Sequence, residues 1–171
     1  MKRKLIFLLL ATLLLTPWPV AYAHDNAMAG QSQIQIEAAE TEAAPHWQAF
    51  GQAIGGVTAG DLFYIDTGDI NADVLVTLHM TNTDELIHCY RYLILNVGVY
   101  AQTGTDQWEK VTMGNGEPLP DTYITMLNGQ VSFTLPGYAK YKITIDKGCF
   151  YCYGTGNDNS AVSPAFYLTV G

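Results

Sequence analysis

Three cysteines are the first residues in this sequence that could carry chemistry. Cys149 and Cys152 form a C-x-x-C pair, and Cys89 lies far upstream. The pair lacks the βαβ context of a thioredoxin-type redox site, and no second C-x-x-C is present to complete a zinc site. We therefore predict a structural disulfide from Cys89 to Cys149 or Cys152, with the third thiol buried or bonded to another molecule. A local bridge between Cys149 and Cys152 is the weaker alternative.

His24 carries the sharpest catalytic hypothesis. It follows Ala21-Tyr22-Ala23, whose small residues are typical of a signal-peptidase site, so it would begin the exported chain. An exported β-sandwich that begins with histidine resembles the copper histidine brace of lytic polysaccharide monooxygenases, which would need a second histidine from His46, His79 or His88. The sequence contains no H-E-x-x-H, no G-x-S-x-G and no phosphate loop. We expect a protein that is not an enzyme, and the copper hypothesis ranks third.

Several carboxylates lie where turns are predicted. Residues 69–73 read D-I-N-A-D, which matches the opening of an EF-hand loop, but Val74 replaces the required glycine and Met80 replaces the bidentate carboxylate. An EF-hand is therefore excluded. A looser calcium site with oxygen ligands remains open, because several carboxylates fall at predicted strand ends, namely Asp61, Asp66, Asp69, Asp73, Asp84 and Glu85. Ordinary turn chemistry is the alternative explanation for these residues.

The N-terminus predicts export. A basic start at 2–4 precedes an apolar run at 5–15, which is too short to span a bilayer. We predict a signal peptide over residues 1–23, a secreted protein that is extracellular or at the cell surface, and no transmembrane anchor after processing. The 171-residue chain has a net charge of −8, and processing removes three basic residues. Nucleic acid is an unsuitable partner for such a chain, because phosphate binding needs basic clusters.

The elements that must position these residues are strands. Apolar runs at 74–80 and 90–100 flank a polar connection, and alternate residues of the second run are apolar. Asn128-Gly129 predicts a two-residue hairpin between strands at 123–126 and 130–135. Strands at this spacing, separated by Gly and Pro turns, predict a single all-β domain over residues 46–171, an antiparallel β-sandwich of immunoglobulin-like or jelly-roll-like type.

Residues 24–45 are predicted to form a flexible N-terminal arm. Residues 33–37 read Q-I-Q-I-E, a strand pattern in which Ile34 and Ile36 share one face. Two interpretations remain open. The segment either pairs with an edge of its own sheet or is donated as a strand to a neighbouring molecule.

Three stretches carry a family resemblance. D-L-F-Y-I at 61–65, D-V-L-V-T-L at 73–78 and Y-R-Y-L-I-L at 90–95, with Glu85-Leu86 between the last two, resemble the core of archaeal cannula subunits. They are similar, to a lesser extent, to camelysin/TasA-like matrix fibre proteins. The resemblance covers residues 61–95 together with the exported start and the final apolar strand.

This resemblance implies a β-sandwich that polymerises outside the cell. In those families an N-terminal segment of one subunit completes the sheet of the next, and cannula subunits use calcium at the contacts. Carried over to this sequence, Ile34 and Ile36 would be the donated anchors. Asp66, Asp69 and Asp73 would be the calcium ligands.

We therefore expect a secreted structural subunit whose partner is itself, a homopolymer assembled into filaments or tubules by donor-strand complementation and assisted by calcium. The alternative is a secreted β-sandwich that binds carbohydrate or protein through an aromatic surface. The candidate residues for that surface are Trp108, Tyr123, Tyr151, Tyr153 and Tyr167.

Overall fold

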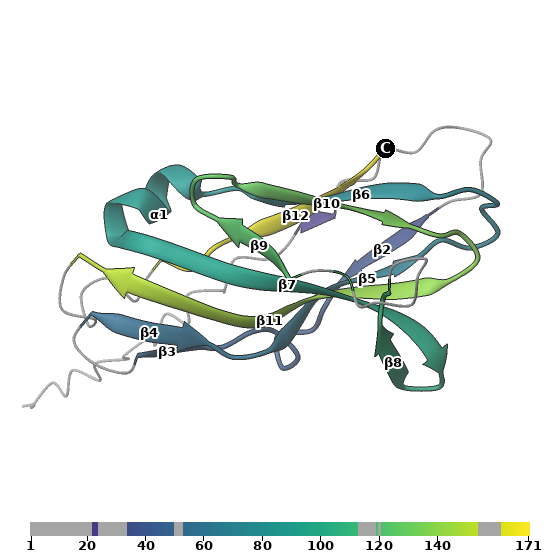
Figure 1. Ribbon diagram of the computed structural model, residues 1–171, viewed down its shortest axis with the longest axis horizontal. Helices are drawn as coiled ribbons and strands as arrows, with labels where there is room; N and C mark the ends of the chain where they lie inside the picture. Colours follow the sequence, from purple (N-terminus) through teal and green to yellow (C-terminus); the bar gives the residue numbers. More distant parts are fainter. Residues whose placement is uncertain (1–21, 24–33, 50–52, 113–118, 120, 154–161) are drawn as a thin grey trace, which may run out of the picture.

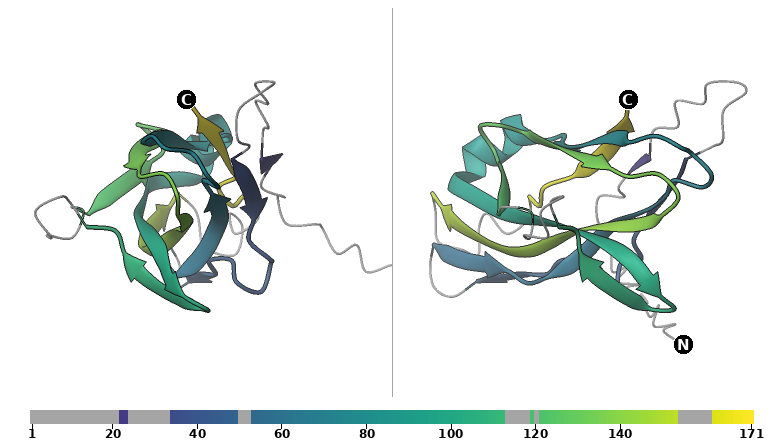
Figure 2. Two further views of the ribbon diagram at one scale, coloured as in Figure 1. Left: turned by 90° about the vertical axis from the view of Figure 1, so that its right-hand side faces the viewer. Right: turned by 45° about the vertical axis from the view of Figure 1, so that its right-hand side comes forward.

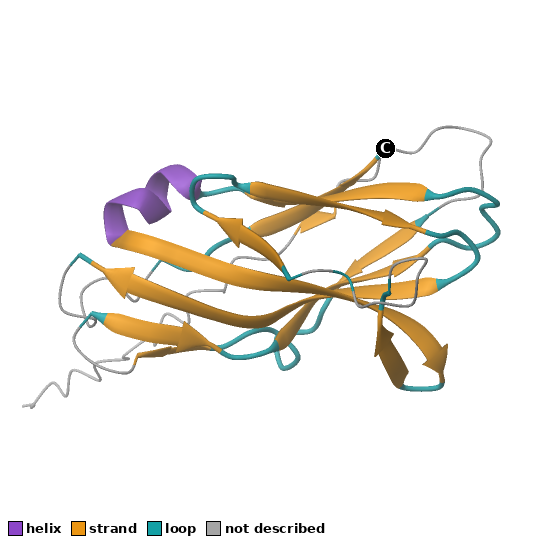
Figure 3. Ribbon diagram, viewed as in Figure 1, coloured by secondary structure: helices purple, strands orange, loops and turns teal. Residues whose placement is uncertain are grey.

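The computed structural model describes residues 22–23, 34–49, 53–112, 119, 121–153 and 162–171. These residues form two packed β-sheets with a short helix at one end of the molecule (Figures 1 and 3). The strands are β1 (Tyr22–Ala23), β2 (Gln35–Ala38), β3 (Trp47–Ala49), β4 (Ile54–Val57), β5 (Gly60–Asp66), β6 (Val74–Met80), β7 (Tyr90–Gly104), β8 (Gln107–Lys110), β9 (Thr122–Thr125), β10 (Gln130–Leu135), β11 (Lys140–Cys152) and β12 (Phe166–Val170), and the helix is α1 (Thr83–Cys89).

The larger sheet is organised around β11. One edge of β11 pairs with β7, and the other pairs first with β5 and then with β4. Beyond these, β2 pairs with β5, β3 with β4, and both β8 and β9 with β7. All of these pairs are antiparallel. The hairpin formed by β8 and the end of β7 extends away from the layered body (Figures 1 and 2).

The smaller sheet has the strand order β1-β12-β6-β10. β12 and β10 pair antiparallel with the two edges of β6. β1 pairs in parallel with the outer edge of β12, where Tyr22 lies opposite Tyr167 and Ala23 opposite Leu168. Among the described residues, two therefore pair with this edge of β12.

The core lies between the two sheets and follows the alternation of the strands. Leu93 and Leu95 of β7 are 1% and 0% exposed, and Val76 and Leu78 of β6 are both 0% exposed. Such alternation buries one face of each sheet against the other. The predicted fold class, a single all-β domain built as an antiparallel sandwich, is confirmed.

The polar connection between β6 and β7 contains α1, which the sequence did not predict. Asp84 and Glu85 lie in its first turn, where carboxylates interact favourably with the helix dipole. Its apolar residue Leu86 is fully buried and closes one end of the core. In the described part of the chain, no helix has the length and apolar character needed to cross a membrane.

The hairpin predicted at Asn128-Gly129 is wrong. Gly129 does adopt a positive φ of 58°. However, the strands on either side belong to different sheets, because β9 pairs with β7 and β10 pairs with β6. The amide of Thr125 donates to Asn128 Oδ1 at 2.7 Å, and the amide of Met80 donates to the carbonyl of Gly129 at 2.8 Å. The turn therefore carries the chain from one layer to the other.

Candidate binding surface

The side of the larger sheet that faces away from the smaller sheet is the most distinctive surface of the described chain, and we call it the outer face. On β7 it is formed by Ile94, Asn96, Gly98 and Tyr100, which alternate with buried residues. Register places Tyr151 of β11 beside both Tyr92 of β7 and Ile54 of β4 on this face. Pairing of β4, β11 and β7 thus gathers side chains from three strands onto one surface.

The basic residues of the described chain are concentrated on the outer face. Four lysines each form an ion pair with a carboxylate there, at N···O distances of 3.0–3.9 Å. The pairs are Lys110–Asp146, Lys140–Asp66, Lys142–Asp61 and Lys147–Asp121. Surface pairs of this kind each contribute less than about 1 kcal/mol. Their main consequence is that these lysines already have anionic partners.

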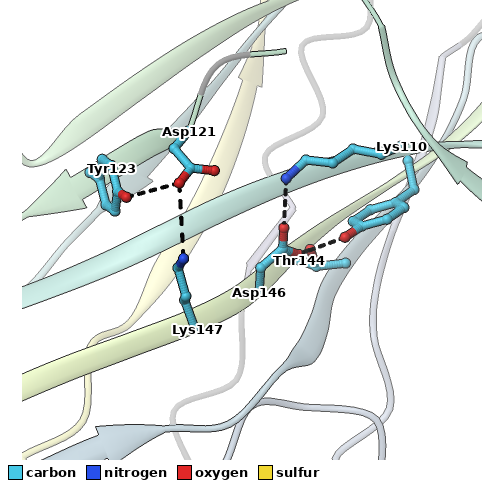
Figure 4. A network of polar contacts seen from close by, with 7 residues as sticks. Lys110, Asp121, Tyr123, Thr144, Asp146 and Lys147 are labelled. Carbon is cyan, nitrogen blue, oxygen red and sulfur yellow. Dashed lines mark hydrogen bonds and ion pairs between the residues drawn. The ribbon is translucent and has the colours of Figure 1, made fainter. Parts of the chain in front are cut away.

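Asp146 lies at the centre of one polar network (Figure 4). It is the extra residue of a β-bulge in β11, and its carboxylate accepts hydrogen bonds from Thr144 Oγ1 at 2.6 Å, Lys110 Nζ at 3.0 Å and the hydroxyl of Tyr100 at 3.1 Å. The hydrogen bond to Asp146 raises the pKa of Lys110. Burial, followed by the charge of Asp146, raises the pKa of Tyr100. The carboxylate fits here because Gly98 has no side chain.

A second network is built around Asp61 of β5. Its carboxylate accepts hydrogen bonds from the hydroxyl of Tyr64 at 2.7 Å and from Lys142 Nζ at 3.0 Å. Lys142 Nζ also lies 5.7 Å from the ring centroid of Tyr100 and 5.4 Å from that of Trp108. Burial, and secondarily the hydrogen bond to Asp61, raises the pKa of Tyr64 to about 12. The polar groups of this network satisfy one another, so it offers little to a ligand.

Arg91 differs from the lysines. It is the unpaired extra residue of a second β-bulge, where Tyr151 pairs with Tyr92 and Cys152 with Tyr90. Its guanidinium carbon lies 5.3 Å from the ring centroid of Tyr151 and 5.6 Å from that of Tyr153, which are cation–π distances. The described residues supply no carboxylate that pairs with it. Arg91 itself is exposed.

Farther along β7, opposite Lys147 of β11 and Tyr123 of β9, lies a buried amide. Asn96 is 2% exposed, and its Nδ2 has no hydrogen-bond partner of acceptable geometry among the described residues. Asp121 accepts a hydrogen bond from the hydroxyl of Tyr123 at 3.0 Å, which is the main cause of its lowered pKa (Figure 4). Asn96 also contributes to that lowering, so its amide lies near the carboxylate. Nδ2 therefore approaches Asp121 without the alignment of a full hydrogen bond.

No protein-family model matches the chain. Comparison with curated proteins likewise finds no significant match to the sequence. The site must therefore be interpreted from its own residues.

The aromatic residues proposed as one surface lie in several places. Tyr151 and Tyr153 do come together, around Arg91. Trp108 packs against Tyr64, with ring centroids 6.0 Å apart. Tyr167 lies in the smaller sheet and stacks on His79, with centroids 4.5 Å apart. The predicted aromatic surface is thus divided, and only its Tyr151–Tyr153 part forms a cluster.

The candidate donor strand lies on its own sheet. β2 pairs antiparallel with the outer edge of β5, with Ile36 opposite Ile65. Ile34 and Ile36 are half-buried and pack against the core, whereas Gln35 and Glu37 are exposed. The alternation predicted for this segment is therefore present, and the acceptor in this structure is the same chain.

The predicted calcium ligands are not gathered into one group. The described residues contain no cluster of three His, Cys, Asp or Glu side chains able to hold a metal ion. Asp66 accepts a hydrogen bond from the amide of Gly68 at 2.9 Å and pairs with Lys140 at 3.1 Å, and the bond from Gly68 is the main cause of its lowered pKa. Asp69 and Asp73 are exposed. Calcium binding by these residues stays a prediction.

The structure contains no disulfide among the three cysteines. Cys152 is buried, while Cys149 is exposed and lies on the outer face opposite Ile94. Burial, and then the proximity of Cys89, raises the pKa of the Cys152 thiol. The amide of Tyr153 also donates to the carbonyl of Cys89 at 3.1 Å. The sequence left two candidate partners open for Cys89. Of these, the fold places Cys152 near Cys89, and Cys149 on the outer face.

His24, the candidate copper ligand, lies outside the described residues. Among its candidate partners, His79 hydrogen-bonds Thr169 through Nε2 at 3.0 Å and stacks on Tyr167. His46 and His88 are exposed at separate positions, before β3 and in the last turn of α1. The copper hypothesis gains no support from this arrangement.

Sequence reasoning missed Arg91, Asn96, Gly98 and Asp146. One signal was available, because Asn96 and Gly98 interrupt the apolar run of β7 with residues that pack poorly in a strand. The position of Arg91 in a bulge had no such signal, since a bulge is defined by two strands together.

Proposed function

We propose that the protein is an exported structural subunit that assembles with copies of itself by exchanging β2. The observation that carries this proposal is the position of β2. It is an edge strand of four residues that, among the described strands, pairs with β5, and together with the preceding residue it contributes two half-buried isoleucines to the core. The same pairing can form between two copies if β2 of one lies on β5 of the other.

The energetic cost of releasing β2 is compatible with exchange. Fully burying an isoleucine contributes about 1.5–3 kcal/mol, so two half-buried ones contribute roughly 2–3 kcal/mol together. Backbone pairing adds about 0.5–1.5 kcal/mol for each hydrogen bond. The total, roughly 4–8 kcal/mol, is recovered when the strand pairs with a second copy. The remaining cost is the entropy of association, which high protein concentration offsets.

In this proposal, calcium binds only at the contacts between two copies of the subunit. The resemblance to cannula subunits implies calcium at subunit contacts, and Asp69 and Asp73 are exposed side chains that could take part in such a contact. Asp66 is already occupied by Gly68 and Lys140. We therefore expect a chelator to leave the melting temperature of the isolated chain unchanged and to alter assembly alone. A chelator-dependent melting temperature of the monomer would contradict this expectation.

The exchange can be tested by crosslinking. Glu37 of β2 and Tyr64 of β5 are directly opposed, so a cysteine pair at these positions has the geometry of a disulfide. We would mix mature chains carrying Glu37→Cys with chains carrying Tyr64→Cys, both in a Cys149→Ser background. A disulfide between the two kinds of chain is expected at high protein concentration.

The matched control replaces Tyr64→Cys with Thr134→Cys, an exposed position on β10 of the smaller sheet. That mixture should not crosslink. If the Glu37→Cys and Tyr64→Cys chains stay separate at every concentration, while a chain with both substitutions forms its internal bridge, β2 does not exchange and the proposal is refuted.

A further inference from the structure

A second site is suggested by the one described cation without a carboxylate partner. Arg91, Tyr92, Tyr151 and Tyr153, which we call the Arg91 cluster, lie together at one end of the outer face. The cluster is separate from β2, which lies on the opposite edge of the sheet beyond β5 and β11. A role for the Arg91 cluster therefore does not depend on strand exchange.

The arrangement of the cluster fixes the position of the guanidinium. Tyr92 and Tyr151 are stacked, with ring centroids 5.9 Å apart and an interplanar angle of 25°. The guanidinium carbon of Arg91 lies within cation–π distance of the Tyr151 and Tyr153 rings. Contact with two rings restricts the rotamers of a side chain that would otherwise lose substantial entropy on binding. No described carboxylate pairs with the guanidinium, whose N–H groups suit a planar, bidentate acceptor such as a carboxylate.

The electrostatic setting favours an anionic ligand at this cluster. The chain has a net charge of −8, so most of its surface repels anions. The four described lysines are all neutralised by ion pairs, whereas no described carboxylate pairs with Arg91. An anion directed to the outer face would therefore find its strongest uncompensated positive charge at Arg91.

The tyrosines indicate what else the ligand must offer. Tyr92 is 42% exposed and Tyr153 is 58% exposed, so their rings present apolar faces and polar hydroxyls to solvent. Ile54, beside Tyr151 on β4, is 51% exposed and extends the apolar surface. A flat surface with ring faces and one bidentate donor suits a sugar ring that carries a carboxylate.

We propose that the Arg91 cluster binds uronate residues of an acidic polysaccharide. The guanidinium of Arg91 would hold the carboxylate in a bidentate contact. Tyr92 and Tyr153 would contact the apolar faces of the sugar rings, and their hydroxyls would hydrogen-bond to the sugar hydroxyls. The site binds the glycan without cleaving it, and it would attach an assembled or single subunit to an acidic matrix.

Binding of a galacturonic acid hexamer to the mature protein, measured by calorimetry, tests the proposal. The matched ligand is the methyl-esterified hexamer, which keeps the rings and removes the charge. Arg91→Gln should weaken binding of the acid hexamer about tenfold or more. Lys140→Gln, which removes the same charge from an ion-paired lysine on the same face, should change it less than about twofold. Esterification should weaken binding as much as Arg91→Gln does.

Three results would overturn the proposal. The first is no binding of the acid hexamer at millimolar concentration, and the second is equal binding of the acid and its ester. The third is an Arg91→Gln variant that changes the oligomeric state of the protein in sedimentation without glycan, since the cluster would then be a contact between copies.

Melting temperatures of the variants confirm folding, and Tyr153→Ala provides a second variant at a highly exposed position. If the chain does not exchange β2 but still binds the hexamer, glycan binding at the Arg91 cluster is independent of assembly.

Discussion

Replacing Gly98 with alanine should disrupt the outer face at one defined point. Gly98 of β7 pairs with Thr144 of β11. A Cβ atom at this position would lie 2.6 Å from Asp146 Oδ2 and 2.6 Å from Thr144 Oγ1, well inside the optimal separation of about 3.5–4.0 Å. The carboxylate must therefore move away from the sheet. Gly98→Ala thus tests whether the absence of a side chain is what allows Asp146 to lie there.

The expected cost follows from what the carboxylate would lose. It accepts hydrogen bonds from Thr144, Tyr100 and Lys110, each with a net contribution of about 0.5–1.5 kcal/mol. The Lys110 side chain is 31% exposed, so its ion pair contributes at the lower end. Crowding adds about 1–3 kcal/mol, and replacing glycine in a strand returns roughly 0.5–1 kcal/mol. Together these contributions predict that Gly98→Ala lowers the free energy of unfolding by roughly 1.5–6 kcal/mol.

Urea unfolding followed by tryptophan fluorescence measures this quantity. Gly104→Ala is a matched control on the same strand, because its nearest neighbour is the end of the flexible Gln107 side chain, and it should cost less than about 1 kcal/mol. A Gly98→Ala/Asp146→Ala variant should be more stable than the sum of the single effects by about 1 kcal/mol or more, since the contact between the Cβ and the carboxylate is then removed and only the one with Thr144 Oγ1 remains. A Gly98→Ala variant within about 0.5 kcal/mol of the wild type, or strictly additive effects, would refute the reasoning.

The other predictions concern the arm, the tyrosine hydroxyls and the thiols. Deleting residues 24–44, which include β2, should leave a folded monomer that forms no filaments in electron microscopy; normal filaments from this truncation would rule out β2 as the donated strand. Burial is the main cause that raises the pKa of Tyr90 from 10.0 to about 12, so its neutral form stabilises the fold fully below pH 10 and this contribution is lost as pH rises towards 12. Relative to Tyr90→Phe, the wild type should therefore lose roughly 2–3 kcal/mol across that range in urea unfolding at fixed pH values, and parallel pH profiles of the two proteins would contradict the assignment. Peptide mapping of the exported protein without reductant should find a bridge between Cys89 and Cys152 and a thiol at Cys149; a bridge that includes Cys149 would show that the sidedness of β11 does not govern pairing.

Periodicity allowed the core of the fold to be predicted from the sequence. Leu93, Leu95, Val97 and Val99 alternate along β7, and burial of one face is sufficient to orient the strand. The same logic identified Ile34 and Ile36 as the apolar face of a strand. It could not identify which edge accepts that strand, because β5 is brought beside β2 only by the complete sheet. Local patterns thus predict which residues face inward, and they leave strand order open.

Most residues of the candidate site could not be predicted from the sequence, because their positions also depend on how strands pair. Arg91 and Asp146 are the extra residues of two bulges, and a bulge depends on the register between two strands rather than on either sequence. Asn128-Gly129 shows the opposite error. Its local preference for a positive φ was correct at Gly129, but the partner strands were decided by the packing of whole sheets.

The two-residue strand β1 has a consequence for the timing of assembly. It comprises Tyr22 and Ala23, the residues that immediately precede the predicted cleavage site. Before cleavage, the chain leading to β2 is fastened to the smaller sheet by β1 and to the larger sheet by β2 itself. Removal of residues 1–23 would release the first attachment, give β2 a free leading end and uncover the edge of β12. If the subunit assembles as proposed, the uncleaved chain would keep both attachments, and cleavage after Ala23 would favour the exchange of β2.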